Sequence, residues 1–163
     1  MKFLTARECD VWRQTYNIAS RSHLDSTSTA AIRSEFRIPS DAGERIALCR
    51  LIWNQLDSIE RLLIVTGWSV WPSGEHLPLF NSLRAVCGER RSLSEAPGQL
   101  FYPKDDGLSF LLVGVLFLWD LEVYDQSGTA IAFSHDEVGV ASLGAHSSQT
   151  MREELDQMGI LIK

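Results

Sequence analysis

The sequence contains few cysteines, and they lie far apart. Cys9, Cys49 and Cys87 are the three cysteines among 163 residues, an odd number with no Cys-x-x-Cys pair. This spacing argues against a disulfide framework and against a zinc site built from thiolates. We therefore expect three reduced thiols and a cytoplasmic location.

The sequence also lacks a hydrophobic run long enough to cross a membrane. Its longest apolar run, from Leu108 to Trp119, is interrupted by Ser109 and Gly114. It falls short of the roughly 20 residues that span a bilayer. The N-terminal stretch MKFLTARECD becomes polar too early to supply the apolar core of a signal peptide. These features predict no membrane association and no export by that route.

Basic residues are scarce in the last third of the chain. The formal net charge is −6 at pH 7, and residues 1–50, 51–100 and 101–163 contribute +2, −1 and −7 to it. An acidic segment repels a phosphate backbone and attracts a basic partner. The charge distribution therefore argues against nucleic-acid binding and favours a basic protein as the partner.

Recognised signatures of catalysis and metal binding are missing as well. The sequence has no Gly-x-Ser-x-Gly elbow, no His-Glu-x-x-His pair and no EF-hand loop. It shows no internal repeat and no linker, and its 45% apolar and 22% charged residues are typical of a globular protein. We predict one domain over residues 1–163, with no cofactor.

Apolar periodicity and capping residues predict the helices. Thr5-Ala6-Arg7-Glu8 has the form of a capping box, which predicts a helix from Thr5 towards Ala19. A second helix is predicted to begin after a cap at Ser40, and a third to begin after a cap at Ser73 and stop at Gly88. A fourth is predicted over Leu108–Leu118 after a cap at Asp105 or Asp106. The last is predicted from about Ser148 to Met158, with a stop at Gly159. Because Leu108–Leu118 is apolar on nearly all sides, we expect it to be the central helix. Residues 20–34 are rich in Ser and Thr, which predicts a flexible loop.

Alternation of apolar and polar residues predicts the strands. A β-rich run predicts a strand at Leu62–Thr66, whereas 88–103 is expected to be irregular. The segment from Trp119 to Glu137 predicts a hairpin with a turn at 125–128, and a further strand is predicted at Val138–Leu143. This order predicts an α+β fold with a small, mainly antiparallel sheet, in which the C-terminal hairpin packs against several helices.

The predicted hairpin carries the candidate binding residues. In its first strand, alternation places the polar positions on a solvent face, and a polar tetrapeptide follows the second strand, where functional sites are common. An aromatic loop earlier in the chain could supply an anchor for an interface. The candidate binding residues are Asp120, Glu122, Tyr124, His135, Asp136, Glu137 and Trp71. None is predicted to be catalytic or to bind a metal.

Two kinds of chemistry remain as alternatives for Ser134-His135-Asp136-Glu137. The first three are the residue types of a catalytic triad, although neighbours in sequence rarely reach one another as a triad requires. The plainer interpretation is that Ser134 and Asp136 satisfy turn amides while His135 packs or bonds across the sheet.

A metal site is the other alternative. His135 and Glu137 could share a strand face, with His76 or His146 nearby, but this spacing selects no particular metal. A small metal-assisted or acid/base enzyme that uses Ser134–Glu137 therefore stays open beside the binding hypothesis.

Four stretches of the sequence resemble a known group of proteins. They are Trp68-Ser69-Val70-Trp71-Pro72-Ser73, Ala96-Pro97-Gly98-Gln99-Leu100-Phe101, Trp119-Asp120 and Ser134-His135-Asp136-Glu137. Together they resemble a family of uncharacterised bacterial proteins of about this length. That resemblance supplies no activity for the chain. The hairpin is also similar to some small acidic immunity proteins that neutralise bacterial toxins. That likeness implies a non-enzymatic role in binding a protein, and it leaves the partner and the oligomeric state open.

Overall fold

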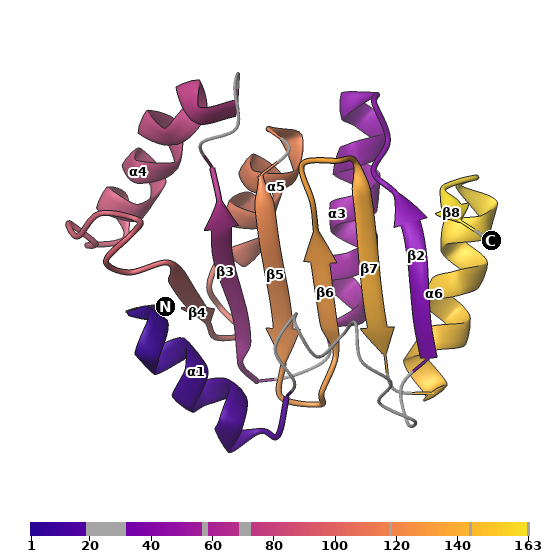
Figure 1. Ribbon diagram of the computed structural model, residues 1–163, viewed down its shortest axis with the longest axis horizontal. Coiled ribbons are helices and arrows are strands. Elements are labelled where there is room, and N and C mark those ends of the chain that lie inside the picture. Colours follow the sequence, from indigo (N-terminus) through magenta and orange to yellow (C-terminus); the bar gives the residue numbers. More distant parts are fainter. Residues whose placement is uncertain (19–31, 57–58, 69–72, 118, 144, 163) are drawn as a thin grey trace.

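The chain folds into one antiparallel sheet with helices packed on both faces (Figure 1). The computed structural model describes residues 1–162 apart from 19–31, 57–58, 69–72, 118 and 144. Within this part of the chain the sheet has eight strands in the order β1-β4-β3-β5-β6-β7-β2-β8. Each neighbouring pair is antiparallel. The predicted α+β fold is confirmed.

Helices and strands are interspersed along the chain. In sequence order they are β1 (Lys2–Leu4), α1 (Ala6–Thr15), β2 (Ile32–Arg37), α3 (Ala42–Gln55), β3 (Arg61–Gly67), the short 3-10 helix η1 (Ser73–His76), α4 (Leu77–Val86), β4 (Gly98–Phe101), α5 (Gly107–Leu116), β5 (Asp120–Asp125), β6 (Ala130–Phe133), β7 (Val138–Leu143), α6 (Ala145–Gln157) and β8 (Leu161–Ile162). The predicted hairpin and the strand after it therefore correspond to β5, β6 and β7.

Side chains cap several helices in the predicted way. The Thr5 N–H donates to Glu8 Oε2 at 2.8 Å and the Glu8 N–H donates to Thr5 Oγ1 at 3.3 Å, which completes the capping box of α1. Asp106 caps α5. The predicted cap of the second helix is wrong by one residue, since Asp41 rather than Ser40 caps α3. A carboxylate at this position also stabilises the helix, because its negative charge lies at the positive end of the helix dipole.

Two of the predicted helix stops are confirmed, and two other helix ends fall short of their predicted limits. Gly88 and Gly159 follow α4 and α6 with φ of 90° and 70°, the left-handed conformation in which glycine commonly ends a helix. α1 ends at Thr15 rather than near Ala19, and α5 ends at Leu116 rather than Leu118.

The sequence prediction missed β1, β2, β4 and β8. β2 begins within the predicted Ser/Thr-rich loop, so that prediction is wrong for residues 32–34. The part of the loop at 20–31 lies outside the described residues. β4 lies within the stretch that was expected to be irregular. β1, β4 and β8 have two to four residues and are defined by pairing with distant partners more than by a local pattern. β2 has six residues, in which Ile32, Ser34 and Phe36 alternate with charged residues.

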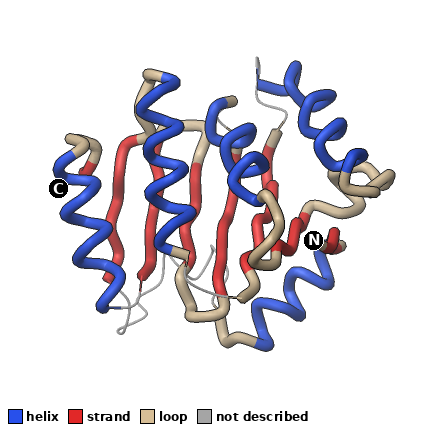
Figure 2. The backbone as a smooth tube through the Cα atoms, turned by 180° about the vertical axis from the view of Figure 1, so that it is seen from behind, coloured by secondary structure: helices blue, strands red, loops and turns tan. Residues whose placement is uncertain are grey.

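The larger core lies between the sheet and the layer of α3, α5 and α6, which Figure 2 shows from behind. Leu63 and Val123 point into it from β3 and β5 and are fully buried. α5 approaches β5 closely, because a Cβ added at Gly114 would lie 2.5 Å from a methyl carbon of Leu121. Leu112 is only partly buried, so the expectation that α5 is covered on nearly all sides is wrong for this position.

A smaller core covers the opposite face of the sheet. There Cys9 and Trp12 of α1 pack against Leu62, Ile64 and Tyr124 of β3 and β5. α1 therefore covers β5 where Tyr124 lies, on the face opposite α5. Among the described residues, no helix is long and apolar enough to span a membrane.

Candidate functional site

The tetrapeptide Ser134-His135-Asp136-Glu137 forms the turn that joins β6 to β7. The Ser134 N–H donates to the Val138 carbonyl at 3.0 Å, and the Glu137 N–H donates to the Ser134 carbonyl at 3.2 Å. Glu137 has φ of 63°, in the left-handed region that glycine usually occupies in such turns. The side chains of Asp136 and Glu137 are 76% and 47% exposed.

His135 connects this turn to the first residue of β5. Its backbone N–H donates to Asp120 Oδ1 at 2.9 Å, and its ring Nδ1 lies 3.0 and 3.2 Å from Asp120 Oδ1 and Oδ2. Its Nε2 lies 3.3 Å from Asp136 Oδ1. The imidazole of His135 thus sits between two carboxylates.

These contacts agree with the plainer interpretation of the turn for Ser134 and His135. The Asp136 N–H donates to Ser134 Oγ at 3.4 Å, and His135 bonds across the sheet to Asp120, as the plainer interpretation predicts. A catalytic triad would need one ring nitrogen of His135 to face the Ser134 hydroxyl, whereas both nitrogens face carboxylate oxygens.

Asp120 takes its position above the backbone of Gly67, the last residue of β3. A Cβ added at Gly67 would lie 2.5 Å from Asp120 Oδ2, so any larger residue there would displace the carboxylate. The pairing of β3 with β5 is irregular at this point, between Val65 and Gly67. The Asp120 side chain is 19% exposed.

Arg45 of α3 holds the other side of the turn. Its guanidinium donates to the carbonyls of Pro39 and Leu116 at 2.5 and 2.8 Å and lies 3.9 Å from Glu137 Oε1. The Glu137 carbonyl also accepts the Ile38 N–H at 2.7 Å. β5, α3 and the segment between β2 and α3 therefore fix the turn from three directions.

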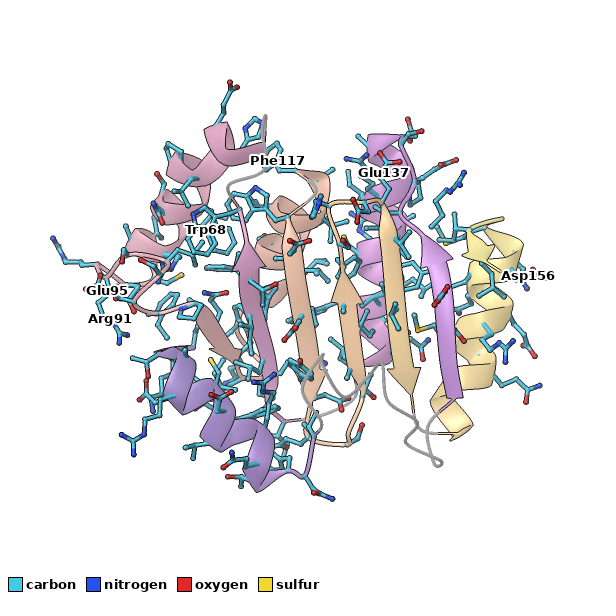
Figure 3. All side chains as sticks on the ribbon, viewed as in Figure 1. Trp68, Arg91, Glu95, Phe117, Glu137 and Asp156 are labelled. Atoms are coloured by element: carbon cyan, nitrogen blue, oxygen red, sulfur yellow. The ribbon has the colours of Figure 1, made fainter. Side chains whose placement is uncertain are left out.

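The start of α3 adds two exposed carboxylates to this end of the molecule. Asp41 and Glu44 lie in the first turn of α3 and are exposed, and α3 begins at the end of the sheet that carries the β6–β7 turn (Figure 1). Figure 3 shows Glu137 at this end, beside α3. We refer to Asp41, Glu44, Asp136 and Glu137 together as the acidic end.

Two of the predicted binding residues are not on the surface. Glu122 and Tyr124 are 6% and 0% exposed, so the prediction of a solvent face formed by Asp120, Glu122 and Tyr124 is wrong. The physical reason is the contact of both side chains with Arg13 of α1, which alternation within the strand cannot reveal. Only Asp120, at the start of the strand, lies beyond the helix.

The buried pair forms a network with α1. The Tyr124 hydroxyl donates to Glu122 Oε2 at 2.7 Å, and Arg13 Nη1 lies 3.3 Å from Tyr124 Oη and 3.6 Å from Glu122 Oε2. Burial, together with the neighbouring Glu122 carboxylate, raises the pKa of the Tyr124 phenol. The network satisfies a carboxylate that would be costly to bury alone.

The remaining candidate positions do not join the turn. Trp71 lies outside the described residues, and the side chain of His146 is not described. The ring of His76 stacks on that of Phe117, with centroids 3.6 Å apart. Within the described part of the chain, no three His, Cys, Asp or Glu side chains gather as metal ligands would.

Several large pKa shifts belong to groups that hold the fold together. Burial raises the pKa of Cys9 and Cys49 to about 12. The Arg91 side chain holds the pKa of Glu89 at about 2, by bonding to the carboxylate of that residue. Cys87 is exposed, and all three cysteines are free thiols.

Comparison with known proteins assigns no role to these residues. The chain matches none of the protein-family models, curated proteins or solved structures with which it was compared. The candidate site is thus defined by the geometry of the turn and its neighbours. Arg45, Asp41 and Glu44 belong to it although the sequence did not point to them, because β2 brings α3 beside the hairpin.

Proposed function

We propose that the chain is a non-enzymatic protein-binding module whose acidic end binds a basic protein. The observation that carries this proposal is the conformation of Glu137. A residue with a side chain in the left-handed region costs about 1 kcal/mol or more relative to glycine. A turn that only connected two strands would be more stable with glycine at this position, and such strain tends to be kept at functional sites.

The exposure of the carboxylates supports the same proposal. Asp136 and Glu137 point to solvent from a turn that is already fixed by Asp120, Arg45 and the Ile38 N–H. A rigid surface loses little conformational entropy when a partner binds. Carboxylates displayed in this way would attract and orient a basic surface.

The contacts of His135 favour binding over catalysis. A general base needs a ring nitrogen that can reach a substrate proton, and both ring nitrogens of His135 already face carboxylates. The resemblance of the hairpin to acidic immunity proteins, a bacterial origin and a cytoplasmic location are further parts of this proposal and stay predictions.

The proposal is tested by reversing charge at the turn. The double variant Asp136→Lys with Glu137→Lys removes the two exposed carboxylates of the turn. The matched control is Glu153→Lys with Asp156→Lys on α6. Both control residues are exposed, and the change in net charge is the same. Each protein is immobilised and used to capture partners from a lysate of the source organism.

We expect a basic protein to be retained by the wild type and by the control but lost by the turn variant. Its association with the wild type should slow about tenfold or more as salt is raised, since charged surfaces act mainly on encounter. Association that is insensitive to both salt and charge reversal at the turn would contradict the proposal, and so would failure to capture any basic protein.

A further inference from the structure

Both ring nitrogens of His135 face groups that only accept hydrogen bonds. Nδ1 lies 3.0 Å from Asp120 Oδ1, and Nε2 lies 3.3 Å from Asp136 Oδ1. A neutral imidazole carries one N–H and one lone pair, so it can donate to one of these carboxylates and must present its lone pair to the other. Only an imidazolium, with an N–H on each nitrogen, donates to both carboxylates at once.

We propose that His135 is a proton-operated clamp on the β6–β7 turn: the imidazolium holds Asp120 and Asp136 together, and the neutral ring releases Asp136. This inference rests on the proposed function only for its consequence, the regulation of binding at the acidic end. The clamp itself is a property of the free protein.

The two carboxylates differ in how firmly they are held. Asp120 also accepts the His135 backbone N–H at 2.9 Å, and both of its oxygens lie within 3.2 Å of Nδ1. Asp136 is 76% exposed and meets the ring through one contact at 3.3 Å. The neutral ring therefore keeps its proton on Nδ1, towards Asp120, and its Nε2 lone pair then repels Asp136.

Other charged groups lie at the same end of the molecule as His135. They are Glu137 in the turn, Asp41, Glu44 and Arg45 at the start of α3, and Arg37 at the end of β2, whose pairing partner is Val138. Arg45 is occupied by two carbonyls and Glu137. Loss of the His135 proton thus removes one positive charge beside the acidic end and frees the Asp136 carboxylate.

This change makes binding of a basic partner depend on pH. The neutral state is more acidic and displays Asp136, so it binds a basic surface more tightly than the protonated state. By linkage, a bound basic partner favours loss of the proton. Affinity should therefore rise with pH through the range in which histidine titrates, between about pH 5 and 8.

The first test is an NMR titration of the His135 ring in the free protein, with the resonance assigned by its loss in His135→Asn. Asp120→Asn and Asp136→Asn should each move the protonation midpoint to lower pH, with the larger shift in Asp120→Asn. Glu137→Gln is the matched control, because its carboxylate pairs with Arg45, and it should move the midpoint least. A midpoint unchanged by Asp136→Asn would overturn the clamp.

The second test measures binding of deca-lysine, as a basic probe, at pH 5.5 and pH 8 at low salt. The wild type should bind several-fold more tightly at the higher pH, and His135→Asn should lose most of this difference. Equal pH dependence in both proteins would overturn the regulatory role. If the NMR shifts appear but the acidic end binds neither the probe nor a captured protein, the clamp stands and the proposed function fails.

Discussion

The polar residues at the two ends of β5 look alike in sequence but behave differently in the fold. Glu122 and Tyr124 lie beneath α1 and bond to each other and to Arg13. Asp120, two residues before Glu122, lies beyond the helix and bonds to the exposed turn through His135. What covers a strand decides whether its carboxylates lock the fold or remain available at the surface.

The strongest test of the buried network is Arg13→Ala. It leaves the Glu122 carboxylate buried without its cation, which should lower the free energy of unfolding by about 3 kcal/mol. Urea denaturation measures the loss. Arg13→Ala combined with Glu122→Leu should recover part of it, because the double variant buries no unpaired charge. A loss below about 0.5 kcal/mol, the size typical of exposed positions, would show that the network does not lock the fold.

The Glu89 carboxylate, which bonds to Arg91, is expected to make the stability of the fold depend on pH. Its pKa in the folded state is about 2, against an ordinary value of 4.5. This bond therefore stabilises the fold above about pH 4.5, and the stabilisation is lost as the pH falls towards 2. We expect a loss of about 2 kcal/mol over this range, measured by denaturation at several pH values. Glu89→Gln should flatten the slope, and an equally steep slope in that variant would assign the acid sensitivity to other groups.

Gly67→Ala tests whether Asp120 positions His135 and the β6–β7 turn. The added Cβ would lie 2.5 Å from Asp120 Oδ2, so the carboxylate must move away from His135. We expect a loss of about 1 to 2 kcal/mol in the free energy of unfolding and a changed NMR signal for the His135 ring. Asp120→Asn is the comparison for stability, because it removes the charge without forcing the side chain to move and should therefore lose less free energy of unfolding than Gly67→Ala. An unchanged His135 signal in Gly67→Ala would mean that the turn is not positioned by Asp120.

The contrast also explains how far the sequence could predict the fold. The hairpin β5–β6, the strand β7, the capping box at Thr5 and the helix stop at Gly88 were predicted closely, since alternation, capping and glycine act locally. The solvent face was predicted wrongly because Arg13 of α1, which contacts both Glu122 and Tyr124, lies about a hundred positions earlier in the sequence.

The candidate site was predicted only in part for a similar reason. His135, Asp136 and Glu137 are consecutive and polar, so the sequence indicates them as one candidate group. The positioning role of Arg45 depends on β2, which places α3 beside the β6–β7 turn through its pairing with β7. β2 begins in a Ser/Thr-rich segment that predicted a loop, although Ile32, Ser34 and Phe36 alternate with charged residues as in a strand. The sequence prediction therefore did not link α3 to the hairpin.

The most direct test of the central claim is Glu137→Gly, measured for both stability and binding. If the turn keeps a strained glutamate for the sake of its carboxylate, glycine should leave the free energy of unfolding unchanged or raise it by up to about 1 kcal/mol, while association with the captured basic protein slows. Glu137→Gln separates the effect of charge from that of backbone strain. Lower stability in Glu137→Gly together with an unchanged association rate would contradict the account, because it would make Glu137 a structural residue of the turn.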